Sequence, residues 1–455
     1  MAGTEQQVDR VGQLRVSKDT VHVRRRRLAG AGLVAVLLLG GCGASALMGG
    51  QDDDTDAAST PTAGPAEATA PTQDAEGTGS AADPAESTQD AGQDEAQDDE
   101  DAPELPWQRE PVAAEHASDT TAMERVDYLT GGMTPKSVMA SGHGLAIANN
   151  MMYSHTSTVF DTTTREQVAV LSDSVDLAEF GVEGHPGLSQ GSPVEAVWTA
   201  DGRYAYVSQY TMYGENFGRE GFDACTVADG VGPSTLYRFD AEEMDWDQVI
   251  KVGAVPKYVA LSPDQSTILV SNWCDATLSV VDTEKGEEVG TIAMDAAPRG
   301  IVIMPDNKTA YAVAMYADQL YEVDIEARSA EVIRQIGSRP RHLNLTEDGS
   351  TLYLTVSGAN AVYRIDTASG EIVDQANPGL EPRSVAMSPD ESALYVVNYD
   401  EATVSKIRTS DMEVIDRVQV DASPIGIDYD PVTNTVWVAC YGGAVYVFDD
   451  QSTLL

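Results

Sequence analysis

Short apolar runs separated by polar turns recur along the chain with a fixed period. Five prolines stand 42 residues apart, and each opens a similar stretch: Pro256, Pro298, Pro340, Pro382 and Pro424. After Pro256 the chain reads YVALS, ILVSN, LSVVD and VGTIAM, which are four runs of strand length divided by turns and a loop. A repeat of this period indicates one supersecondary unit copied along the chain.

The copies number seven, because Pro135 and Pro193 open two longer ones. The last copy ends after its third strand, and MERVDYL, just before the first copy, has the pattern of the missing fourth strand. Such an exchange closes a ring and leaves few exposed edges, which favours a ring over a solenoid. The pattern therefore predicts an all-β, seven-bladed β-propeller with four-stranded blades, whose last blade is completed by an N-terminal strand.

The first 41 residues have the pattern of an export signal. A basic cluster, Arg24 to Arg27, precedes an uncharged stretch that ends in Leu39-Gly40-Gly41-Cys42, which resembles a bacterial lipobox. The resemblance implies a lipoprotein-type signal peptide over residues 1–41 and lipidation of Cys42. A signal-anchor helix over 28–50 is the alternative. Both interpretations place the rest of the chain outside the cytoplasm. The lipoprotein interpretation also predicts a lipid anchor on the outer face of the bacterial cytoplasmic membrane.

Residues 42–120 are predicted to form an acidic disordered linker, and residues 121–455 the propeller. The linker contains almost nothing apolar, so it cannot bury a core. Trp107 is an isolated apolar residue, which we interpret as incidental. The net charge of -45 disfavours nucleic acid as a partner. We expect a monomer.

A cation follows the opening proline in five copies: Lys136, Lys257, Arg299, Arg341 and Arg383. These positions start the innermost strands, so they should surround the mouth of the central channel on the face of the crossovers, with His342 beside them. One interpretation is a site for an anionic ligand or an acidic partner. The other is that each cation pairs with an acid of the next blade, such as Glu195 or Glu381. The sequence does not decide between these two interpretations.

Aromatic residues fall near the same mouth. One equivalent position, 17 residues past the proline, holds Tyr210, Trp273, Tyr399 and Tyr441. They either contribute to ligand binding, since aromatic faces suit flat or sugar-like groups, or wedge between blades as core.

Two insertions are predicted on the crossover face, in neighbouring loops. One lies in the first crossover, around SDSVDLAEFGVEGHPGLSQG, and the other between the second and third strands of the second copy. The second contains Cys225, and the equivalent loop of the next blade contains Cys274. Outside the cytoplasm these two cysteines are expected to form a disulfide. Cys440 ends a strand and is expected to be a buried thiol. The Pro-Asp turns lie on the opposite face and receive no function.

The search for catalytic and metal-binding motifs finds little. The GLSQG stretch at 187–191 fits a nucleophile elbow but lacks the surrounding parallel strand and helix. One interpretation of the histidines and methionines near the crossover face is a copper or haem site, formed from His155, His185, His342, Met152, Met212 and Met315. We favour the simpler interpretation, which is that these are scattered loop residues. We therefore expect no catalytic residue, no metal and no cofactor.

The strand pairs LYVVN…VSKIR, ILVSN…LSVVD and LYLTV…VYRID, each after Pro-Arg or Pro-Lys, resemble the YVTN-repeat bacterial β-propellers. The resemblance covers 135–455 and implies the fold. Relatives include exported surface proteins and lactonase-like enzymes, and no enzymatic motif carries over. We expect a membrane-anchored binding or scaffold propeller with an anionic ligand or partner at the crossover face. The alternative is an enzyme in the funnel, such as a lactonase-like hydrolase or lyase.

Overall fold

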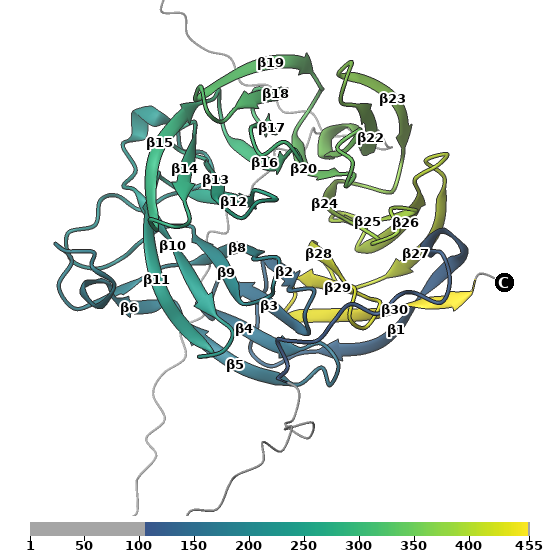
Figure 1. Cartoon of the computed structure of the whole chain (residues 1–455), viewed down its shortest axis with the longest axis horizontal. Coiled ribbons are helices and arrows are strands. Elements are labelled where there is room, and N and C mark those ends of the chain that lie inside the picture. Colours follow the sequence, from purple (N-terminus) through teal and green to yellow (C-terminus); the bar gives the residue numbers. More distant parts are fainter. Residues whose placement is uncertain (1–104, 454–455) are drawn as a thin grey trace, which may run out of the picture. The chain divides into compact units, whose positions relative to one another are not determined.

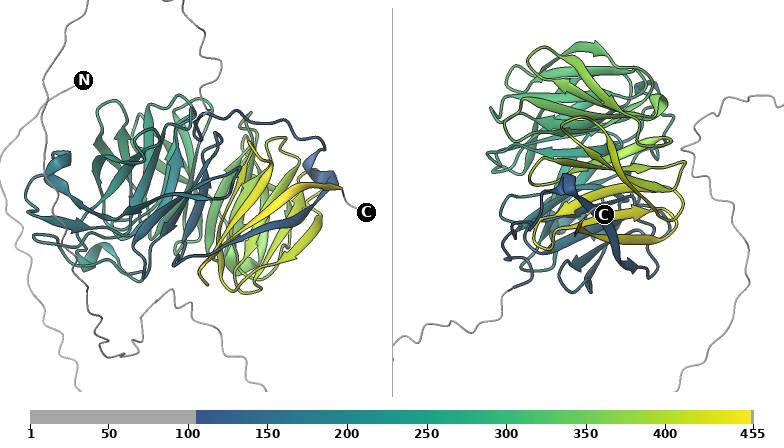
Figure 2. Two further views of the ribbon diagram at one scale, coloured as in Figure 1. Left: turned by 90° about the horizontal axis from the view of Figure 1, so that it is seen from below. Right: turned by 90° about the vertical axis from the view of Figure 1, so that its right-hand side faces the viewer.

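Seven antiparallel sheets of four strands surround a common axis (Figure 1) in a computed structural model that describes residues 105–453. The innermost strands of neighbouring sheets contact one another all the way round, including the last and the first. Figure 2 shows the sheets from the side, with their strands running between the two faces of the ring. The predicted seven-bladed β-propeller is confirmed.

The blades follow the chain. Blade 1 is β2 (Ser137–Ala140), β3 (Leu145–Asn150), β4 (Thr156–Asp161) and β5 (Gln167–Ser172). Blade 2 is β8 (Pro193–Trp198), β9 (Tyr204–Gln209), β10 (Ser234–Asp240) and β11 (Asp245–Val252). Blade 3 is β12 (Pro256–Leu261), β13 (Thr267–Asn272), β14 (Thr277–Asp282) and β15 (Glu287–Ala293). Blade 4 is β16 (Pro298–Ile303), β17 (Thr309–Ala314), β18 (Gln319–Asp324) and β19 (Ser329–Gln335).

The remaining blades close the ring. Blade 5 is β20 (Pro340–Leu345), β21 (Thr351–Val356), β22 (Ala361–Asp366) and β23 (Glu371–Ala376). Blade 6 is β24 (Pro382–Met387), β25 (Ala393–Asn398), β26 (Thr403–Arg408) and β27 (Val414–Gln419). Blade 7 is β28 (Pro424–Asp430), β29 (Thr435–Cys440), β30 (Ala444–Thr453) and the N-terminal β1 (Thr121–Leu129). Four short 3₁₀ helices accompany them: η1 (Ser118–Thr120), η2 (Leu177–Phe180), η3 (Val227–Asp229) and η4 (Ser357–Ala359).

The closing strand is the one that the sequence predicts. β1 lies antiparallel to β30, with Arg125 opposite Phe448 and Tyr128 opposite Tyr446. It contains the MERVDYL segment and occupies the outer edge of blade 7, so the two ends of the described chain share one sheet. This pairing covers the edge that β30 would otherwise expose.

The hydrophobic core lies between neighbouring blades. The second strands are continuous apolar or small-residue runs with almost every side chain buried, as in β25 and β29, whereas the outer strands expose alternate residues. One cluster joins Ile147 of blade 1 to Val207 and Phe239 of blade 2, and similar clusters join the later pairs of blades. Because the core is placed between sheets, the residues that face the axis can be polar.

The inner strands begin with a repeated distortion. The residue before each of the five regularly spaced prolines has a positive φ, between 52° and 61°. In blades 2 to 6 the pairing register between the first and second strands shifts between the proline and the third residue after it. A proline at the first ladder position donates no hydrogen bond, which suits such an irregularity. The distortion turns the chain from the crossover into the inner strand.

Residues 105–120, which their composition assigns to the linker, lie against the propeller. Trp107 packs on the core cluster of blades 1 and 2, and the Arg203 guanidinium lies 5.2 Å from its ring centre. Both terminal nitrogens of Arg109 bind the Asp161 carboxylate, at 2.7 and 2.9 Å. Our interpretation of Trp107 as incidental is therefore wrong, because its side chain is partly buried against the core cluster of blades 1 and 2. The signal peptide, Cys42 and the linker up to residue 104 lie outside the described residues.

Candidate functional site at the axial mouth

The crossover face carries the two insertions, and they contact each other. The first forms the hairpin β6 (Ser174–Asp176) and β7 (Leu188–Gln190), and Gln190 exchanges backbone hydrogen bonds with Tyr213 of the second, at 3.0 and 2.7 Å. The ring of His185 stacks on Phe217, 4.0 Å between centroids. The insertions therefore form one structured rim beside blade 2.

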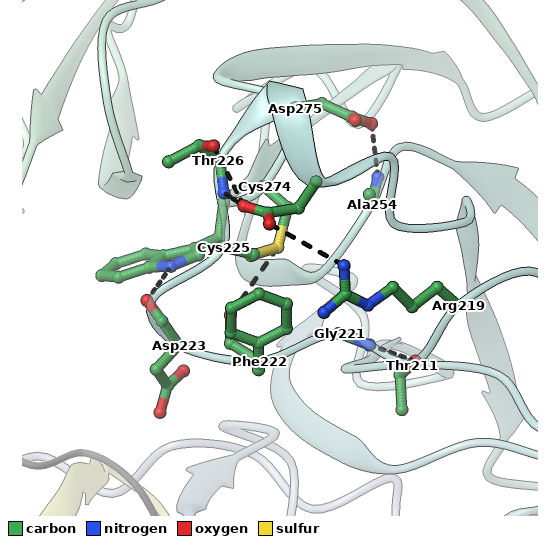
Figure 3. Close-up of a disulfide and its surroundings, with 12 residues drawn as sticks. Thr211, Arg219, Gly221, Phe222, Asp223, Cys225, Thr226, Ala254, Cys274 and Asp275 are labelled. Atoms are coloured by element: carbon green, nitrogen blue, oxygen red, sulfur yellow. Dashed lines mark hydrogen bonds and ion pairs between the residues drawn. A yellow bond between two sulfur atoms is a disulfide. The ribbon is translucent and has the colours of Figure 1, made fainter.

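A disulfide ties the second insertion to blade 3 (Figure 3). It joins Cys225 and Cys274, whose Cα atoms are 5.3 Å apart. The third cysteine of the described chain, Cys440, is a buried free thiol, and burial raises its pKa to about 12. The disulfide holds the neighbouring residue Asp223 at the rim of the axial mouth.

Asp223 neutralises one of the five repeat cations. Its carboxylate accepts from Lys257 Nζ at 2.6 Å and from the Tyr210 hydroxyl at 2.9 Å, while its backbone carbonyl accepts from Trp273 Nε1 at 2.8 Å. Asp223 was not predicted as a site residue, because the repeat does not predict the path of an inserted loop. The proximity of Asp223 to Cys225 was the available signal.

Glu381 pairs with two more, which leaves one net positive charge in this group of three. It accepts from Arg383 at 2.6 and 2.9 Å and from Arg341 at 3.3 Å, and Arg341 Nε also donates to Ser357 at 2.7 Å. For Arg341 the structure thus has the pairing with an acid of the next blade that the sequence left open, whereas Arg383 pairs with the same acid at the start of its own blade 6. Both guanidinium groups are almost fully buried.

Arg299 differs from these cations. It is partly exposed, and within residues 105–453 no carboxylate lies at ion-pair distance from it. Its guanidinium lies 5.8 Å from the centre of the Trp273 ring. Arg299 is the repeat cation whose charge is least compensated by a direct contact.

The predicted aromatic residues hold the cations. Lys257 lies 4.3 Å from the ring centre of Tyr210, Arg383 lies 3.4 Å from that of Tyr399, and Lys136 lies 5.4 Å from that of Tyr441. Such cation–π contacts contribute roughly 0.5–2 kcal/mol each. The four rings therefore line the mouth but face its cations, which leaves less of their surface for a ligand.

A small cavity lies on the axis below the mouth. Arg299, Arg341 and Arg383 line it together with Glu195, Tyr258, His342 and Ser384, and its water-accessible volume is about 10 Å³. That is room for about one water molecule. Three of the five repeat cations therefore meet at this cavity, whereas Lys136 and Lys257 do not line it.

The electrostatics of the cavity are unusual. Burial raises the pKa of Glu195 to about 7, against the charges of Lys136, Arg299 and Lys257, which lower it. Burial and the charge of Arg299 lower the pKa of His342 to about 3. From the sequence, Glu195 was expected only as a pairing partner, and Tyr258 was not predicted as a site residue. Both stand two residues past their prolines, and that shared position was the missed signal.

The histidines of the suggested metal site do not meet. His155 contacts Asp173 at 3.0 Å, His185 stacks on Phe217, and His342 contacts Tyr258 at 2.6 Å. In the described part of the chain, no group of three His, Cys, Asp or Glu residues is placed to hold a metal ion. No helix of residues 105–453 has the length and apolar character needed to span a bilayer.

Comparisons with known proteins bear on the fold. No family model and no curated protein sequence matches the chain. Among solved structures, a hydrazine synthase of Kuenenia stuttgartiensis is similar, with a TM-score of 0.54 and 19% identity over 70% of this chain and 96% of the other. A chain of a mitotic checkpoint complex is similar with a TM-score of 0.58 and 10% identity, over 77% and 97%. At these identities the likenesses show the fold alone, which is that of a β-propeller with seven blades.

Proposed function

We propose that this propeller is a binding protein that accepts an anionic group at the crossover mouth, with Arg299 as its principal contact. The observation that carries the proposal is the partly exposed Arg299 guanidinium, which has no ion-pair partner among the described residues and lies beside the axial cavity. Lys136 adds positive potential at Glu195 nearby, whereas the charge of Lys257 is paired with Asp223. In a chain with net charge -45, this local positive field attracts a carboxylate or phosphate selectively.

The narrow axis restricts the geometry of such a ligand. A space for about one water cannot enclose a carboxylate or a phosphate, so the anionic group meets the partly exposed Arg299 from the mouth. The remainder of the ligand, or of an acidic partner protein, lies across the mouth and against the insertions of blades 1 and 2.

The test uses the full chain and three probes: inorganic phosphate, succinate and a penta-glutamate peptide, each titrated by calorimetry. Arg299→Gln should weaken binding of the preferred probe at least about tenfold, as for loss of a charge-assisted hydrogen bond. Arg125→Gln, on the exposed face of β1, is the matched control and should bind like the natural protein. Absence of binding by all three probes, or equal binding by both variants, would refute the proposal.

We propose that the propeller is held on the outer face of the bacterial cytoplasmic membrane by a lipid on Cys42, in line with its resemblance to exported YVTN-repeat propellers. The support is the Leu39-Gly40-Gly41-Cys42 sequence after a basic and apolar segment. Cys42→Ser should abolish incorporation of labelled palmitate and release the protein from the membrane fraction. A variant that stays in the membrane would indicate a signal anchor.

A hydrolase in the funnel is the second candidate. Glu195 favours it, because a carboxyl group whose pKa is about 7 suits general acid or base catalysis. The cavity holds about one water beside Glu195, which leaves no room for a substrate without opening. Turnover of a simple lactone by the protein and its loss in Glu195→Gln would favour this candidate over simple binding.

A further inference from the structure

A second and larger cavity opens on the opposite face of the ring, where the inner strands end. It measures about 590 Å³ and is lined by residues of the inner strands of blades 1 to 5. Pockets for small organic ligands commonly measure about 300–1,000 Å³. Pro263 and Pro305 line it, although they belong to turns that the sequence analysis left without function.

The walls of this cavity, which we call the lower pocket, are mostly apolar. Met139, Val197 and Val302 line it, and the polar residues of its wall are Asn344, Thr346 and the acidic Glu347. Of the described residues that line it, none is a lysine, an arginine or a histidine. The walls therefore favour a ligand that is mostly apolar and carries no negative charge.

Tyr258 separates the lower pocket from the small cavity at the mouth. It lines both, and its hydroxyl reaches from blade 3 to His342 of blade 5, at 2.6 Å. Blade 4 carries Gly300 at the equivalent position, where a Cβ atom would stand 2.5 Å from the Arg341 carbonyl oxygen. No side chain of blade 4 therefore blocks the path of the tyrosine between blades 3 and 5.

The hydrogen bonds of His342 determine which way the Tyr258 proton points. The backbone N–H of Val385 donates to His342 Nδ1 at 3.1 Å, so this nitrogen carries no proton. A neutral imidazole then has its proton on Nε2, which donates to the Tyr258 oxygen. Because burial and Arg299 lower the pKa of His342 to about 3, the ring stays neutral at ordinary pH.

The Tyr258 hydroxyl keeps a proton to donate. Burial raises its pKa, so the group stays protonated. Within residues 105–453 no acceptor other than His342 lies at hydrogen-bond distance from this hydroxyl, and His342 uses its Nε2 as a donor. A buried donor without an acceptor is costly, and a ligand atom can remove that cost.

We propose that the lower pocket binds an uncharged, mostly apolar small molecule through an oxygen acceptor, such as a ketone or ester carbonyl, that accepts a hydrogen bond from Tyr258. This site is separate from the anionic site at Arg299. The proposal for the lower pocket does not depend on the proposal for the anionic site at Arg299.

The test compares two probes of the same shape. Acetophenone carries a carbonyl group, whereas α-methylstyrene has a methylene group in its place. Their affinities for the full chain in lipid nanodiscs are measured by saturation-transfer NMR, with empty nanodiscs subtracted. Tyr258→Phe should weaken acetophenone about fivefold, the worth of one neutral hydrogen bond, and leave α-methylstyrene unchanged.

Two further variants secure the location. Val302→Phe places a ring in the lower pocket and should abolish binding of both probes, and Val197→Phe repeats the test from blade 2 in case the first variant does not fold. Tyr153→Phe, an exposed tyrosine, is the control and should change neither affinity. The proposal is overturned if acetophenone does not bind, if Tyr258→Phe weakens both probes equally, or if the folded phenylalanine variants still bind.

Discussion

The hydroxyl of Tyr258 lies 2.6 Å from Nε2 of His342, although the two residues belong to blades 3 and 5 and stand 84 positions apart. They occupy the same position of the repeat, two residues past Pro256 and Pro340. Val385 of blade 6 fixes the other nitrogen of the imidazole. Three blades are thus joined across the axis by one chain of hydrogen bonds, in a fold whose core otherwise lies between neighbouring sheets.

Removing the hydroxyl should cost stability. Tyr258→Phe leaves the buried His342 Nε2–H without an acceptor, so the free energy of unfolding should fall by about 1–3 kcal/mol. The double variant with His342→Phe should lose less than the sum of the two single variants, because each partner is then apolar. Denaturant unfolding of the four proteins measures the coupling. Strict additivity would contradict the described bond.

Glu195 should make stability depend on pH. Its pKa rises from the ordinary 4.5 to about 7 in the folded protein. The stability that its protonated form contributes to the fold is therefore complete below pH 4.5 and is lost as the pH rises through 7. Glu195→Gln should therefore gain stability relative to the natural protein between these values, by about 3 kcal/mol at most. Thermal unfolding of both proteins across this range checks the prediction. A constant difference for Glu195→Gln would contradict it.

The repeat predicted the parts of the structure that depend on periodicity. The positions of Pro256 and its equivalents indicated the blades, their inner strands and the convergence of Arg299, Arg341 and Arg383. The closing strand was also predictable, because Met123 to Leu129 supplied an apolar pattern where the last blade lacked one. These features follow from backbone geometry that every copy shares.

The chemistry of the site depended on features that the copies do not share. Asp223 reaches Lys257 because a disulfide directs an insertion there, and no period encodes its path. Tyr258 and His342 meet only because blade 4 has glycine between them. Individual residues at the repeat position, rather than the repeat itself, decide which chemical groups meet at the axis.

The disulfide should stabilise both the fold and the rim. Cys225 and Cys274 are separated by 49 residues, for which loop entropy gives about 4 kcal/mol. The double variant with serine at both positions should unfold at a markedly lower temperature, and a reductant should lower the midpoint of the natural protein but not that of the variant. A reductant effect of equal size in the variant would show that another group is responsible.

The buried ion pair between Lys406 and Asp450 should be the most sensitive point of the ring closure. Both side chains are fully buried, with 2.5 Å between Nζ and Oδ1, and Nζ also donates to the hydroxyl and carbonyl oxygens of Thr121 at 2.7 and 2.9 Å. Lys406 of blade 6 thereby binds both β30 and the N-terminal strand β1. Burial lowers the pKa of Lys406 and raises that of Asp450, so neither charge is stable without the other.

Lys406→Met should lower the free energy of unfolding by about 3–5 kcal/mol, because the Asp450 carboxylate is left buried without a cation. Lys406→Met combined with Asp450→Leu should recover much of this loss, since both partners are then apolar. Lys285→Met breaks the exposed pair with Asp282 and, as the matched control, should cost less than about 1 kcal/mol. Guanidinium unfolding followed by tryptophan fluorescence measures all three. If Lys406→Met lowers the free energy of unfolding as little as the control does, the N-terminal strand closes the ring without help from this ion pair.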